Sequence, residues 1–176
     1  MGAASALKRK ADFLTALRLL GVFVIPLTWF IQGPAAVSGL GGWLLLAFWA
    51  TDLFDGRLAR QSGLAGNGFL GRNDGWIDLM LSLSGWTLLS LAGFINPTLY
   101  LLVALVVVGL VSLDFLAFQG PAVFLLFVFY FGTAFTQNPA ILAGLAVFLV
   151  LHAIFSRERF LALYPRFLDH WKNRLS

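Results

Sequence analysis

Four aspartates occupy a short glycine-rich stretch between two apolar segments, residues 52 to 78. Asp52 and Asp55 are three residues apart, and Asp74 and Asp78 are four apart, so on helices each pair shares one face. Two helices joined by the intervening loop can therefore point four carboxylates into one space. An aspartate at a membrane helix centre costs about 2.5 to 3.5 kcal/mol, and carboxylates that close repel one another. The pattern predicts a bound cation, and oxygen ligands without histidine or cysteine suit Mg²⁺ or Mn²⁺.

The rest of the chain is too apolar for a soluble domain. Of its 176 residues, 60% are hydrophobic and 11% are charged. Six apolar runs, each near the ~20 residues that cross a bilayer, cover residues 13–32, 36–57, 75–95, 98–118, 121–137 and 139–156. We therefore expect one all-α integral membrane domain over residues 1–176, built as a six-transmembrane-helix bundle among membrane lipids. No nucleic-acid partner is expected, and the absence of cysteine excludes disulfides and thiol chemistry.

Positive charges are unevenly distributed along the chain. All twelve Lys and Arg residues lie near the start, around the aspartate stretch, or after the last apolar run, and the turns QGPAAVSGLGG, INPT and TQNP carry none. Because positively charged turns stay inside, both termini and the acidic site are predicted to face the cytoplasm from a multi-pass cytoplasmic or inner membrane. The first run also resembles a signal peptide, but the charge pattern needs it as a span.

Both ends of the chain carry amphipathic patterns. SALKRKADFL, before the first run, suits an N-terminal juxtamembrane helix on the anionic leaflet, and a disordered basic tail fits equally well. After Ser156, aromatic and leucine residues recur at helical spacing opposite charged ones. This second pattern predicts a C-terminal interfacial amphipathic helix.

The aspartate stretch resembles the signature of the CDP-alcohol phosphotransferase family, in which Asp-x2-Asp-Gly-x2-Ala-Arg is followed by a loop and Asp-x3-Asp. Here the signature reads Asp52-x2-Asp55-Gly56-x2-Ala59-Arg60, then Asp74-x3-Asp78. Leu14-Thr15-x2-Arg18, followed by Pro26, is similar to the first-helix pattern of that family. The match covers the signature directly and, through six spans and cytoplasmic ends, most of the chain.

The chain departs from the family pattern in the loop. The segment from Arg60 to Asp74 is one residue longer, and Phe69 or Leu70 stands where the family places its second glycine. A glycine-rich loop absorbs an insertion locally, so the departure bears on its nucleotide contacts more than on the metal site.

The resemblance implies an enzyme of phospholipid biosynthesis. It would move a phosphatidyl group, or another substituted phosphoryl group, from a CDP-alcohol such as CDP-diacylglycerol to the hydroxyl of a small acceptor alcohol, and release CMP. Two Mg²⁺ or Mn²⁺ ions would be held by Asp52, Asp55, Asp74 and Asp78. Asp78 would also be the catalytic base, and the CDP moiety would bind against Gly56, Ala59 and Arg60.

Two arginines are candidates for phosphate contacts, Arg18 and Arg72. For Arg18 a buried ion pair, for instance with Asp114, is the alternative. The resemblance also implies a homodimer, for which the small residues Ser82, Ser84 and Gly85 would allow close packing, although they suit an intramolecular contact equally well.

The acceptor alcohol and the exact function stay open at this point. A phosphatidylglycerophosphate synthase is one alternative, but the turn LDFLAFQGPAV has no Lys or Arg to bind a phosphorylated acceptor. A cation transporter would use the acidic cluster as a transit site, yet the non-cytoplasmic half lacks acidic residues. The lengthened loop leaves a catalytically silent family member as the third alternative.

Overall fold

The computed structural model describes residues 2–63 and 68–154, and within those ranges the side chains of all but Ala3 and Arg60. These residues are helical and contain no strand, as the apolar runs predicted. The elements are α1 (Gly2–Leu27), α2 (Trp29–Gln32), η1 (Gly33–Val37), α3 (Leu40–Ser62), α4 (Gly68–Leu91), α5 (Pro97–Leu113), α6 (Phe115–Gln137) and a last helix, Ala140–Ile154.

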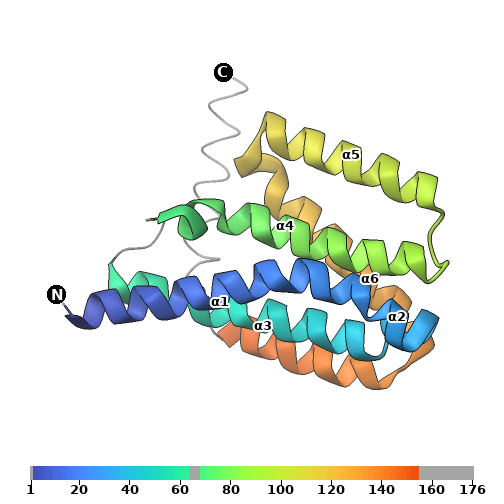
Figure 1. Ribbon diagram of the computed structural model, residues 1–176, viewed down its shortest axis with the longest axis horizontal. Helices are drawn as coiled ribbons and strands as arrows, with labels where there is room; N and C mark the ends of the chain where they lie inside the picture. The colour runs from blue at the N-terminus through green and yellow to red at the C-terminus, as the bar shows by residue number, and fades with distance from the viewer. Residues whose placement is uncertain (1, 64–67, 155–176) are drawn as a thin grey trace.

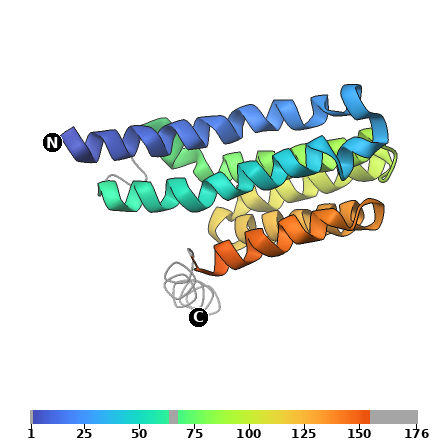
Figure 2. The same cartoon turned by 90° about the horizontal axis from the view of Figure 1, so that it is seen from below.

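The long helices run side by side in one bundle (Figure 1). α1 packs against both α3 and α4, while α5 and the Ala140–Ile154 helix lie at opposite edges. The start of α1 and the end of α3 lie at the same end of the bundle (Figure 2). The arrangement therefore brings the first helix against both helices that carry aspartate pairs.

Two helical stretches are long and apolar enough to cross a membrane, Ala4–Val37 with a mean hydropathy of 1.9 and Phe115–Gln137 with 1.8. Pro97–Leu113 and Ala140–Ile154 are apolar but shorter. α3 and α4 carry the charged residues of the aspartate stretch, which lowers their hydropathy. Length and composition thus support membrane association through these two helices.

Several helix ends differ from the predicted ones. α1 runs without a break from Gly2, so the predicted N-terminal helix is present as the start of α1 and not as a separate element, and the disordered tail is wrong. The Ala, Leu, Lys and Arg residues before Phe13 are strong helix formers and simply extend the first span. Residues 36–39 belong to η1 and a turn instead of the second span, and α4 begins before the predicted third span. The predicted C-terminal amphipathic helix lies outside the described residues.

The break between α5 and α6 falls at Asp114, earlier than predicted. The Asp114 carboxylate accepts a hydrogen bond from the Ala117 N–H at 3.1 Å and so caps α6. Because this cap satisfies a free N–H of the first turn, α6 begins at Phe115, and Pro121 lies within the helix instead of at its start.

The small residues of α4 pack inside the chain. Ser82 and Ser84 are buried, and a Cβ placed on Gly85 would lie 3.0 Å from Leu45 Cδ2 and 3.1 Å from Tyr130 Cδ2. These small residues therefore lie where α4 packs against α3 and α6. Of the two roles considered for them, the structure shows the intramolecular contact.

Candidate metal centre

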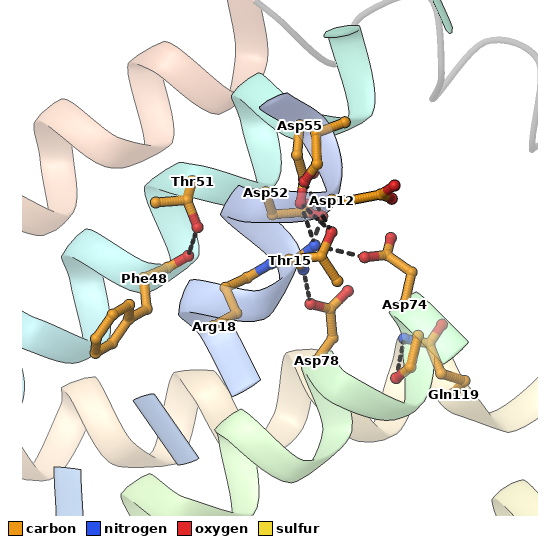
Figure 3. A network of polar contacts seen from close by, with 12 residues as sticks. Asp12, Thr15, Arg18, Phe48, Thr51, Asp52, Asp55, Asp74, Asp78 and Gln119 are labelled. Carbon is orange, nitrogen blue, oxygen red and sulfur yellow. Dashed lines mark hydrogen bonds and ion pairs between the residues drawn. The ribbon is translucent and has the colours of Figure 1, made fainter. Parts of the chain in front are cut away.

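All four aspartates of the stretch converge on one guanidinium, that of Arg18 on α1 (Figure 3). Its Nη1 donates to Asp52 Oδ1 at 3.1 Å and to Asp78 Oδ1. Its Nη2 donates to Asp55 Oδ2 and to Asp74 Oδ1, both at 2.5 Å. The predicted convergence of the carboxylates is therefore confirmed, and the cation among them here is an arginine.

The spacing of the residues explains this geometry. The pairs on α3 and α4 each occupy one helix face, and α1 fills the space between those faces. Arg18 is completely buried, whereas the Asp74 side chain is 33% exposed. The site is thus closed on the Arg18 side and open near Asp74, at the start of α4.

Three of the carboxylates form a group that could hold a metal ion. Asp52, Asp74 and Asp78 each offer one oxygen, and the three oxygens lie within 4.8 Å of one another. Oxygens on opposite sides of a Mg²⁺ ion lie about 4.2 Å apart, because each Mg–O bond is about 2.1 Å long. Small side-chain movements would therefore bring this group into coordinating distance, while the geometry does not choose between metals.

Asp55 lies beside this group and is held differently. Its side chain is 3% exposed, and Oδ2 accepts hydrogen bonds from Thr15 Oγ1 at 2.9 Å and from Arg18. Its other oxygen, Oδ1, is buried without a hydrogen-bond partner. Leaving such an oxygen unsatisfied costs about 1–3 kcal/mol. A cation ligated by Oδ1 would remove that cost, so this carboxylate also fits a metal site.

The charge balance of the site also favours a bound cation. With all four carboxylates ionised, the guanidinium of Arg18 by itself balances one of four negative charges in a mostly buried site. Buried charges are tolerated only when they are compensated by partners of opposite sign. A metal ion bound among these carboxylates would add to that compensation. The residues present therefore fit a divalent-metal centre.

The other predicted site residues lie on α3 and α4. Gly56 and Ala59 are half-buried on α3, and Arg60 follows on the same helix. Arg72 is exposed on α4, where its Nε donates to the Gly68 carbonyl oxygen at 3.4 Å. The structure thus directs this arginine toward its own helix and not into the aspartate cluster.

The buried ion-pair role considered for Arg18 is confirmed, but Asp114, the partner suggested for it, is wrong. Arg18 uses its four ion pairs on the aspartates of α3 and α4, and the Asp114 carboxylate caps α6. The physical reason is the packing of α1, which turns Arg18 toward α3 and α4.

Two residues near the site received no role from the sequence. Thr15 belongs to the first-helix pattern and donates to Asp55. Gln119 of α6 donates from Nε2 to the Gly75 carbonyl oxygen at 3.4 Å, next to Asp74 in the chain. A Cβ on Gly75 would lie 2.6 Å from Phe115 Cζ, so the first turns of α6 pack closely against this part of α4. The only sequence signal for Gln119 was its place in the predicted turn LDFLAFQGPAV, which has no Lys or Arg.

Comparison of the chain with protein-family models, with curated proteins and with solved structures gives no match. The family resemblance therefore rests on the signature residues and on their convergence in space.

Proposed function

We propose that this chain is a divalent-metal-dependent CDP-alcohol phosphotransferase that moves a phosphatidyl group from CDP-diacylglycerol to a small alcohol and releases CMP. One observation carries the proposal. The four aspartates, with the spacing of the family signature inside each pair, converge from two helices on the guanidinium of Arg18, and the buried Oδ1 of Asp55 beside it has no hydrogen-bond partner.

We also propose that the chain is a multi-pass membrane protein of six spans, with the site on the cytoplasmic side. The outer faces of α5 and α6 support a lipid environment, because large apolar side chains are exposed there, among them Leu101, Leu105, Phe124 and Leu125. The positive-inside rule places the aspartate end of the bundle in the cytoplasm. A CDP-linked lipid would then reach the site from the surrounding leaflet.

The proposed reaction is an in-line transfer in which the signature aspartates take part. The acceptor oxygen forms a bond to the phosphorus that bears the lipid alcohol, the bond from that phosphorus to CMP breaks, and CMP leaves with the electron pair. Asp78 takes the proton of the acceptor hydroxyl on a carboxylate oxygen. Divalent ions, when bound by the aspartates, would bind the pyrophosphate and neutralise charge that develops in the transition state.

The remaining residues orient and admit the substrates. Thr15 fixes the orientation of Asp55 through its hydrogen bond. Gly56 lacks a side chain and lets the nucleotide approach the backbone of α3 beside the aspartates. The exposed side of Asp74 provides the opening through which the diphosphate would enter.

The direct test measures CMP release from CDP-diacylglycerol by the purified protein with Mn²⁺ or Mg²⁺ and a panel of small alcohols. We expect release with at least one alcohol and a loss of at least about a hundredfold in Asp78→Asn, the scale of general base catalysis. Asp114→Asn is the matched control, since it makes the same change at a helix cap that asparagine can also provide. Equal release by Asp78→Asn and the wild type would contradict the proposal, as would no release with any alcohol.

A further inference from the structure

We propose that Arg18 is an internal counter-cation, which holds the four carboxylates together when no divalent ion is bound and competes with those ions for the same carboxylates. The inference rests on the metal site of the proposed function and extends it to a residue of α1. It is carried by the geometry of the guanidinium and by its burial.

The guanidinium and a metal ion would use the same carboxylates. Arg18 contacts one oxygen of each aspartate, and these include carboxylates of the three-aspartate group that could hold a metal. A hard divalent ion needs oxygens at about 2.0–2.6 Å with no hydrogen between. An N–H group directed at the same lone pair stands in the way, so each metal–oxygen bond formed in that direction replaces a contact of Arg18.

The side chain of Arg18 is held in a way that allows this exchange. Its contacts with the aspartates all come from Nη1 and Nη2, while Nε is buried without a hydrogen-bond partner. The guanidinium can therefore turn away from the carboxylates without breaking a hydrogen bond at Nε. A released guanidinium stays within the site, since the residue is completely buried, and becomes available to an anionic phosphate.

Without Arg18, the four carboxylates of the metal-free site would lose the cation that all of them contact. Removing one partner from a buried ion network is strongly destabilising, because the remaining charges are uncompensated. The same removal frees all four carboxylates for divalent ions. Loss of Arg18 should thus lower the stability of the metal-free protein and raise its affinity for divalent ions.

The test uses the full chain in detergent, with Mn²⁺ as the probe and electron paramagnetic resonance to count free Mn²⁺. Four proteins are compared: wild type, Arg18→Gln, Arg18→Lys and Arg9→Gln. Arg9 is exposed on the same helix, so its change removes one positive charge of α1 outside the site. Thermal unfolding is followed for each protein in chelator and in excess Mn²⁺, which gives a readout independent of catalysis.

We expect Arg18→Gln to bind Mn²⁺ about tenfold or more tightly than the wild type, within the usual range of coupling between ligands. In chelator its unfolding midpoint should fall by on the order of 10 °C, and Mn²⁺ should restore most of the loss. Arg18→Lys should also bind Mn²⁺ more tightly, because one ammonium cannot bridge the four carboxylates as the planar guanidinium does. Arg9→Gln should match the wild type in both measurements.

Two results would overturn the role of Arg18. One is Mn²⁺ binding by Arg18→Gln that is no tighter than in the wild type. The other is Arg18→Lys equal to the wild type, which would reduce the effect to net charge. If Arg18→Gln does not fold, Arg18→Lys still tests the proposal. Absence of Mn²⁺ binding in all four proteins would instead remove the metal site and the proposed function together with this inference.

Discussion

Thr15 and Asp55 are joined by a hydrogen bond of 2.9 Å from the threonine hydroxyl to carboxylate Oδ2, which connects α1 to α3 inside the acidic site. Both side chains are buried, at 5% and 3% exposure. The same oxygen accepts from Arg18 one turn further along α1. Two residues of one helix thus hold a carboxylate of its neighbour, and the position of Asp55 depends on how α1 packs.

Replacing Thr15 with valine should destabilise the protein by about 1–3 kcal/mol, because the buried carboxylate of Asp55 loses a donor while the shape of the side chain is kept. Thr15→Ser keeps the hydroxyl and should retain most of the stability. Thermal unfolding in detergent measures both. If valine and serine were equivalent, the hydrogen bond would not contribute to holding Asp55.

The three-aspartate group predicts an order of metal affinities. Asp52→Asn, Asp74→Asn and Asp78→Asn should each weaken Mn²⁺ binding by at least about tenfold, since loss of an outer-shell partner alone costs about 10–100-fold. Asp55→Asn should weaken it less, because Asp55 lies outside the group whose oxygens are within 4.8 Å of one another. Titration with Mn²⁺ checks this order, and a largest loss in Asp55→Asn would reverse the assignment.

Gly41 marks a close approach between α3 and its neighbours. A Cβ there would lie 2.4 Å from Leu88 Cδ2 and 2.8 Å from the Ala36 carbonyl oxygen, and the backbone atom cannot easily move aside. Gly41→Ala should therefore cost about 1–3 kcal/mol through overpacking. Gly109→Ala on α5 is the control, since nothing lies within 4 Å of its Cβ position. Alanine there should be neutral or stabilising by up to about 1 kcal/mol, so equal effects of the two changes on the unfolding midpoint would contradict the packing.

The cap at Asp114 makes a separate prediction for the start of α6. Asp114→Ala removes the acceptor for the Ala117 N–H and should cost about 1 kcal/mol, whereas Asp114→Asn should be nearly neutral because asparagine caps as well as aspartate does. The unfolding midpoints of the two variants, each compared with the wild type, check this prediction. A neutral alanine variant would mean that the helix start does not depend on this cap.

Much of the helical architecture could be predicted from the apolar runs and from the Asn-Pro pairs between them. The apolar runs predicted helices throughout, and Asn96-Pro97 and Asn138-Pro139 marked turns that the structure has. Asn96 accepts from the Thr98 N–H and so caps α5, a local interaction that a sequence pattern can reveal. The break at Asp114 was missed because the start of this helix was predicted at Pro121. Aspartate at an N-cap is also a signal for a helix start.

The sequence by itself determined that each pair of aspartates shares one helix face, because helical spacing fixes which residues of one helix lie together. Only the tertiary structure decided that the two pairs meet and that Arg18 lies among them. Arg18 is separated from Asp52 by 34 positions and from Asp78 by 60, so no local rule connects them. Their contact follows from the side of α1 that packs between α3 and α4, and packing of that kind depends on all three helices at once.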